Sequence, residues 1–102
     1  MVESGLNQKN LGAQKQSFES VTKFVRGVVV RSAAGRDRGD FQVILKTEKD
    51  YAFVCDGRHR FLENPKRKNR KHLFFTNTVL NEEFLTTNKL IRKSLRIFSQ
   101  KI

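Results

Sequence analysis

Two stretches of the sequence carry basic side chains at spacings suited to binding phosphate groups. In the first, "GVVVRSAAGRDRGDF" at positions 27–41, three valines lead into a charged segment hinged by Gly35 and Gly39. Glycine accepts backbone conformations that other residues avoid, so we expect a tight loop with Arg36 and Arg38 exposed at its tip. Because a guanidinium forms forked hydrogen bonds with phosphate oxygens, this loop is a candidate anion-binding element.

The aspartates of the same loop leave its role open. Asp37 and Asp40 either orient the arginines or cap the turn, whereas the simpler alternative is a hairpin loop whose charges are only solvated. The loop does not match the phosphate-binding loop of nucleotide hydrolases. That motif needs G-x-x-x-x-G-K followed by Ser or Thr, and here the two glycines are one residue too close and no such Lys follows.

The second stretch is the tract "KRKNRK" at positions 66–71, in which five of six residues are lysine or arginine. Phosphates that neutralise such a tract release bound counterions, so nucleic acid is its natural partner. A nuclear-localisation peptide is the alternative interpretation. Pro65 and the apolar segments on both sides place the tract inside a folded domain instead.

The composition of the whole chain supports an anionic partner. The 102 residues include 21 Lys and Arg against 10 Asp and Glu, which gives a formal net charge of +11. Such a balance favours nucleic acid or an anionic membrane surface as the partner. The alternative is a soluble protein whose charge only makes its molecules repel one another. The length predicts one domain with a modest core. With nine Phe and no Trp in the chain, the phenylalanines are needed inside it.

Catalysis and metal binding have little support in the sequence. Cys55 is the only cysteine, so no internal disulfide can form, and we expect the residue to be packed in the core. His59 and His72 lie among arginines and lysines, which is a weak pattern for a metal site. No Ser-His-Asp pattern or paired carboxylates stand out, so we predict a protein that is not an enzyme and uses no cofactor or metal.

The N-terminal region and the hydropathy of the chain predict a cytoplasmic protein. The polar residues 1–17 are expected to form a flexible arm, and they lack the continuous apolar stretch of a signal peptide. No segment approaches the roughly 20 apolar residues of a membrane span. A chain with a single cysteine also suits a reducing compartment.

Short apolar segments between turns predict a small all-β domain over residues 18–80. The valine-rich segment 26–32 and the alternating segments 41–47 and 51–57 predict three strands. Asp56-Gly57 signals a turn before a fourth strand over 58–64. Residues 73–80 form either a fifth strand or an irregular apolar crossing. Four or five short strands favour a barrel.

Residues 81–102 predict an amphipathic basic helix that begins at Asn81, the expected N-cap. Its apolar side chains recur at helical spacing and are Phe84, Leu90, Ile91, Leu95, Ile97, Phe98 and Ile102. We expect this apolar face to cover the barrel. The alternatives are pairing with a second copy, or contact of the basic face with RNA or an anionic membrane.

The segment "GVVVRSAAGRDRGDFQVI" resembles the KOW motif, in which an apolar strand, a glycine-containing basic loop and an alternating strand follow one another. The continuation "YAFVCDGRHRFLENPKRKNRKHL" is similar to the KOW-containing RNA-binding proteins of bacteria, which are akin to the fourteen-e type of large-subunit ribosomal protein. The matching stretches cover about half of the chain and are Ser32 to Gly39, Asp56-Gly57, Arg60, Pro65 to Asn69 and Lys71 to Leu73.

This resemblance implies an SH3-like barrel that binds structured RNA without catalysis. The expected ligand is ribosomal RNA of the large subunit, with ribosomal proteins as candidate neighbours and no membrane partner. The RNA-binding residues that it implies are Arg36, Arg38, Arg58, Arg60, Lys66, Arg67, Lys68 and Lys71. Arg70 and His72, in the same basic stretch, are further candidates. The rival hypothesis is a KOW module that docks on proteins, for example in transcription, through its C-terminal helix. Which RNA is bound, and whether the protein is a ribosomal component or an associated factor, stay open.

Overall fold

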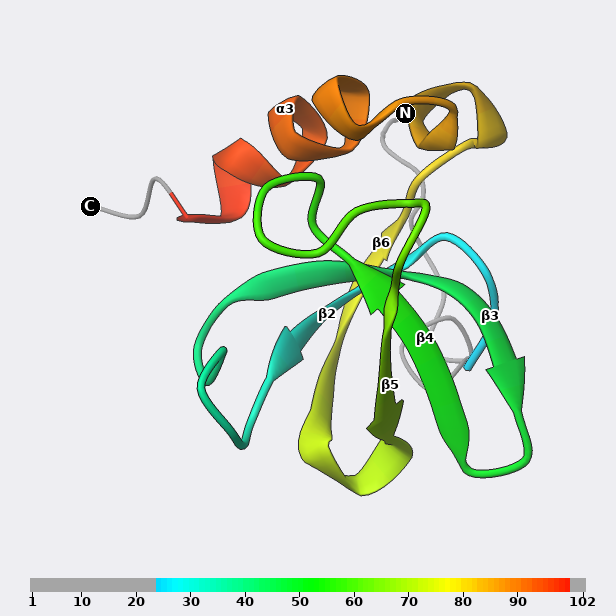
Figure 1. Cartoon of the computed structure of the whole chain (residues 1–102), viewed down its shortest axis with the longest axis vertical. Helices are drawn as coiled ribbons and strands as arrows, with labels where there is room; N and C mark the ends of the chain where they lie inside the picture. Colours follow the sequence, from blue (N-terminus) through cyan, green and yellow to red (C-terminus); the bar gives the residue numbers. More distant parts are fainter. Residues whose placement is uncertain (1–23, 100–102) are drawn as a thin grey trace, which may run out of the picture.

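Valine-rich and alternating segments form one antiparallel sheet in the computed structural model, which describes residues 24–99. The strands are β2 (Val28–Ser32), β3 (Phe41–Glu48), β4 (Tyr51–Cys55), β5 (Lys66–Asn69) and β6 (Leu73–Val79). They lie in the order β5-β4-β3-β2-β6 (Figure 1). The predicted mainly-β architecture with a C-terminal helix is confirmed, whereas the arm predicted over 1–17 lies outside the described residues.

The three consecutive valines of β2 are fully buried because both faces of this strand are covered. Val29 belongs to the apolar cluster beneath the C-terminal helix, while Val28 and Val30 belong to the cluster on the opposite face. The same division continues on β3, where Val43 joins the first cluster and Ile44 the second. A strand buried on both faces needs an unbroken apolar run, which explains the valine triplet.

The two ends of the strand order are consecutive along the chain. β5 and β6 are joined by the short 3-10 helix η1 (Arg70–His72), yet they occupy opposite edges of the sheet. β2 lies between its two neighbours because it pairs with β3 on one side and with β6 on the other. Within residues 24–99 no ladder joins β5 to β6, so the structure shows an antiparallel sheet without the full closure of the predicted barrel.

The segment between β4 and β5 is a loop, and the prediction of a strand over 58–64 is wrong. Asp56 Oδ1 accepts hydrogen bonds from the backbone N–H groups of Arg58, His59 and Arg60, at 2.8 to 2.9 Å. A carboxylate that binds three consecutive amides holds them in a turn and removes them from any ladder. The fourth strand is instead β5, so the basic tract itself forms the edge of the sheet.

The predicted C-terminal helix divides into a 3-10 helix, η2 (Glu82–Leu85), and an α-helix, α3 (Asn88–Ser99). Thr87 caps α3, because its Oγ1 accepts a hydrogen bond from the backbone N–H of Leu90 at 3.1 Å. Asn81 precedes η2 and makes no side-chain cap hydrogen bond. The prediction of one continuous helix that begins at Asn81 is therefore wrong.

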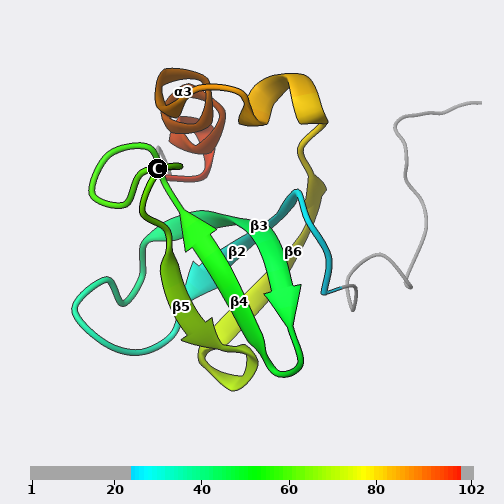
Figure 2. The ribbon, with the colours of Figure 1, turned by 45° about the vertical axis from the view of Figure 1, so that its right-hand side comes forward.

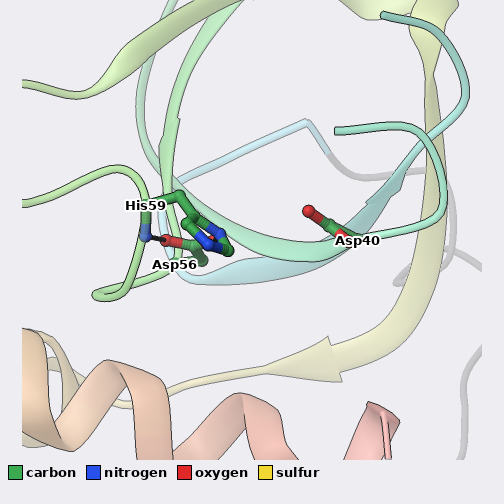
Figure 3. Close-up of side chains that lie close together, drawn as sticks. All are labelled: Asp40, Asp56 and His59. Carbon is green, nitrogen blue, oxygen red and sulfur yellow. Dashed lines mark hydrogen bonds and ion pairs between the residues drawn. The ribbon is translucent and has the colours of Figure 1, made fainter. Parts of the chain in front are cut away.

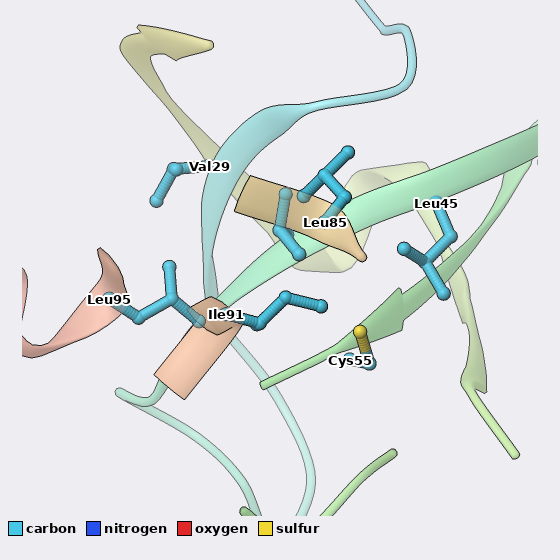
Figure 4. Packing of buried hydrophobic residues seen from close by; sticks show 7 residues of the cluster. Val29, Leu45, Cys55, Leu85, Ile91 and Leu95 are labelled. Carbon is cyan, nitrogen blue, oxygen red and sulfur yellow. The ribbon is translucent and has the colours of Figure 1, made fainter. Parts of the chain in front are cut away.

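Both helical elements cover one face of the sheet, as the apolar spacing predicts. Leu85, Ile91 and Leu95 are buried in the cluster shown in Figure 4, together with residues of β2, β3 and β4. Ile97 is 70% exposed, so the buried stripe of α3 is narrower than the sequence indicated. Between residues 24 and 99, no helix has the length and apolar character needed to cross a membrane.

Candidate nucleic-acid interface

A buried lysine links the glycine-hinged loop to the basic tract. The ammonium of Lys68, in β5, donates to Asp37 Oδ1 at 2.8 Å, to the carbonyl of Ala34 at 2.8 Å and to Ser32 Oγ at 2.5 Å. Only 5% of the Lys68 side chain is exposed. Because its donors are used inside the protein, Lys68 does not lie on the surface where the sequence placed it among the RNA-binding residues.

Asp37 is the centre of this buried network. Its carboxylate also accepts hydrogen bonds from Ser32 Oγ at 2.8 Å and from Gln42 Nε2 at 2.7 Å, and it lies 3.7 Å from the ammonium of Lys66. Burial alone would raise the pKa of Asp37, but the hydrogen bonds from Lys68, Gln42 and Ser32 outweigh it and hold the pKa well below the ordinary value. The aspartate therefore binds the lysines of the tract rather than orienting the loop arginines.

The glycines give the 33–40 loop the tight shape that the sequence predicts. Gly35 and Gly39 have φ angles of +87° and +91°, in the left-handed region that favours glycine. The loop closes on itself through a hydrogen bond from the N–H of Gly39 to the carbonyl of Ser32, at 2.8 Å. This closure leaves Arg36 and Arg38 exposed at the tip.

Strand alternation divides the basic tract between two directions. Lys66 and Lys68 point toward Asp37, whereas Arg67, between them, lies over the ring of Tyr51 at 3.6 Å from its centroid. Arg70, in η1, lies over the ring of Phe24 at 4.9 Å. A further group of the predicted residues is exposed at this end of the sheet and comprises Arg67, Arg70, Lys71 and His72.

The 33–40 loop, β5 and the 56–65 loop lie on the same side of the molecule, at the left in Figure 2. The proximity of Asp37 to Lys66 and Lys68 establishes that the first two lie side by side. Arg58 and His59, in the 56–65 loop, line a common hollow with Gly39 and Asp40 of the 33–40 loop. The two basic stretches and the turn after β4 are thus brought together although they are far apart in the sequence.

Three arginines that no sequence motif indicated as site residues line the same hollow. Arg31 of β2 and Arg92 and Arg96 of α3 approach it from two sides of the sheet–helix junction. Arg92 Nη1 donates to the carbonyl of Gly57 at 3.0 Å, which attaches α3 to the 56–65 loop. A signal was present in the basic face of the helix, but no local pattern relates that face to Arg31.

Among the described residues, Asp40, Asp56 and His59 form a group that could hold a metal ion (Figure 3). Each offers one oxygen or nitrogen atom, and these atoms lie within 4.8 Å of one another. Asp56 Oδ1 is occupied by three backbone N–H groups, and Asp56 Oδ2 lies 3.8 Å from His59 Nδ1. Four arginines line the hollow beside these side chains, and their positive charge opposes the binding of a metal cation. The arrangement therefore favours an anion at this place.

Cys55 is fully buried in the apolar cluster beneath α3, as predicted. Burial and, to a smaller extent, the neighbouring Asp56 carboxylate together raise the pKa of its thiol to about 12. A thiol in this state is a weak nucleophile, so Cys55 contributes to packing and is not a candidate catalytic group.

Comparisons of the chain with protein-family models and with curated proteins found no match.

Proposed function

We propose that this protein is a non-catalytic RNA-binding module that uses its exposed arginines and lysines to hold phosphates of structured RNA. The observation that carries the proposal is the contact of Asp37 with Lys68, because it brings the arginine loop to the edge strand that carries the tract. The binding surface is formed by Arg36, Arg38, Lys66, Arg67, Arg70, Lys71 and His72, with Arg58 and Arg60 beside it. Lys68 supports this surface from inside.

The charge and geometry of the surface support RNA as the partner. Guanidinium groups held over aromatic rings, as Arg67 is over Tyr51, are positioned before a ligand arrives and lose less freedom on binding. A second hollow of about 560 Å³, lined in part by Arg70 and Lys71, makes the surface concave at this end of the sheet. Hydrogen bonds and ion pairs with phosphates give affinity, and the shape of the RNA then supplies most of the selectivity.

The finer assignment is a partly open SH3-like barrel of the KOW type that belongs to a ribosomal or ribosome-associated protein in the cytoplasm. Support comes from the strand order, in which β6 returns beside β2, and from the 3-10 helix between the two edge strands. The glycine-hinged loop between β2 and β3 stands where the KOW resemblance requires it. Ribosomal RNA of the large subunit remains the proposed ligand.

The proposal is tested by measuring the affinity of the full chain for a structured ribosomal RNA fragment at several salt concentrations. Replacing Arg36 and Arg38 by Ala should weaken binding and reduce the salt slope by roughly 0.7 to 0.9 for each phosphate that the variant no longer neutralises. The control is Lys89→Ala with Lys93→Ala, since both lysines are exposed on α3 and line neither hollow. Equal slopes for the two folded variants would remove the loop from the interface.

Crosslinking in cells followed by sequencing of the attached RNA identifies the ligand. Ribosomal fragments from one locus would support the ribosomal assignment, and scattered messages would oppose it. The rival hypothesis is a protein-docking module that uses α3. It has less support, because Ile91 and Leu95 are already buried on the sheet and Ile97 is the one large apolar side chain of the described helix that is highly exposed. Absence of RNA binding by the wild-type protein would favour this rival.

A further inference from the structure

The hollow between the sheet and α3 has the size and lining of a small-ligand site. Its volume is about 570 Å³, within the range of about 300 to 1,000 Å³ that is usual for ligand pockets. The aromatic rings of Phe41 and Phe98 line it, with their centroids 5.3 Å apart. The four arginines of the lining are Arg31, Arg58, Arg92 and Arg96.

Two of these guanidinium groups are held in place by backbone carbonyls. Arg31 Nε donates to the carbonyl of Gly39 at 3.3 Å, and Arg92 Nη1 donates to the carbonyl of Gly57 at 3.0 Å. Each bond uses one of the five N–H groups of an arginine and leaves others for a ligand. The guanidinium of Arg31 also lies 5.8 Å from the centroid of the Phe41 ring. The arginines are thus fixed beside an aromatic surface.

A nucleotide matches this lining better than a simple anion does. Phosphate oxygens suit the arginines, and a flat base suits an aromatic ring or a guanidinium plane. The hollow also contains the acceptors Asp40 and Asp56, which a free phosphate dianion would repel. A ribose hydroxyl or the amino group of a base can donate hydrogen bonds to these carboxylates. Apolar rings, arginines and carboxylates are therefore all used by one ligand class.

We propose that the hollow between α3 and the 33–40 and 56–65 loops is a binding site for one unpaired nucleotide of RNA. This inference rests on the proposed function and names the form of RNA that it requires. A base paired in a duplex is stacked and covered, so it cannot enter the hollow, whereas a base in a loop, bulge or single strand can. The protein should therefore bind an RNA with an unpaired nucleotide better than a fully paired RNA of equal length.

The test compares two RNA probes with the full-length protein: a single-stranded oligonucleotide of about 10 nucleotides and the blunt duplex of the same sequence. The pocket variant is Arg31→Gln with Arg96→Gln, because both arginines line the hollow and neither belongs to the surface proposed for the loop and the tract. Its control is Lys89→Gln with Lys93→Gln, which removes the same number of charges from residues that do not line the hollow. Thermal unfolding of both variants checks that they fold. Arg31→Gln alone replaces the double variant if that one does not fold, because the Arg31 side chain is exposed.

The pocket variant should bind the single strand about tenfold more weakly and the duplex no more than about twofold more weakly, as expected when the interactions with one nucleotide are removed. The lysine control should bind both probes at most about twofold more weakly, since charges that do not line the hollow act only through the general field. Equal effects on the two probes would overturn the pocket while leaving RNA binding by the loop and tract intact. Failure of the wild-type protein to bind these probes and the structured ribosomal RNA fragment would instead reject the proposed function itself.

Discussion

The buried ion pair of Lys68 with Asp37 predicts that one lysine of the basic tract acts in folding and not in binding. Replacing Asp37 by Asn leaves the ammonium of Lys68 with neutral acceptors alone, which are the oxygens of Ser32 and Ala34 and the amide oxygen that takes the place of the carboxylate. Removing one partner of a buried ion pair typically costs about 3 to 5 kcal/mol. Asp37 is 16% exposed, so we expect a cost at the lower end, about 3 kcal/mol.

The replacement Lys68→Met should cost somewhat less than Asp37→Asn. The carboxylate of Asp37 keeps its hydrogen bonds from Ser32 and Gln42 and its proximity to Lys66. We therefore expect a decrease of about 2 kcal/mol in the free energy of unfolding, the value of a hydrogen bond between charged groups. The double variant should cost less than the sum of the single variants, because both remove the same ion pair.

Urea unfolding of the wild type, of Asp37→Asn, of Lys68→Met and of the double variant measures these free energies directly. Lys66→Met is the matched control, since Lys66 belongs to the same strand and lies 3.7 Å from the same carboxylate, but is 30% exposed. A pair of that kind contributes about 1 kcal/mol or less. If Lys68→Met destabilises the protein no more than Lys66→Met, the network does not hold the loop to the strand and the reasoning fails.

Two further predictions concern acid and the turn after β4. The pKa of Asp37 is lower in the folded protein than its ordinary value of 3.8, so the unfolded chain binds more protons in acid. The ionised Asp37 carboxylate therefore adds its full contribution to the free energy of unfolding above that value, and this contribution is lost as the pH falls below it. Urea unfolding between about pH 5 and about pH 2 should show the difference between wild type and Asp37→Asn shrinking, and a constant difference would contradict this. Gly57→Ala should lower the melting temperature far more than Gly35→Ala: both glycines have positive φ, but a Cβ at Gly57 would overlap the carbonyl oxygen of Asn88, whereas at Gly35 the nearest atom is 3.6 Å away. Similar decreases would show that strain in φ, and not the packing of α3, decides the cost.

The strands that the sequence predicted are those whose burial leaves a local pattern. The valine triplet of β2 and the alternation along β3 record which faces are covered, and both segments are strands. The error over 58–64 has an equally local cause. Arg58, His59 and Arg60 lie after an aspartate whose side chain accepts hydrogen bonds from their amides, so the Asp-Gly pair begins a loop and not a short turn into a strand.

The edge strand could not be predicted from its own residues, because lysine has a low preference for strands. β5 forms through its pairing with β4, in which Lys68 lies opposite Ala52, and through the burial of that lysine beside Asp37. Both partners are distant along the chain, and no spacing rule connects them. The same limit applies to the hollow, where Arg31 meets the arginines of a helix that begins more than fifty residues later.

A count of basic residues is therefore a poor measure of the charge that a surface exposes, as this tract shows. Alternation along β5 sends Lys68 inward and leaves Arg67 outside, so neighbouring cations in one run have opposite environments. The inward lysine binds the 33–40 loop to the strand, and so brings the exposed arginines of the loop to the same side as those of the tract. A single substitution at Lys68 should consequently alter the whole surface through the loop, although its own ammonium is not exposed to a ligand.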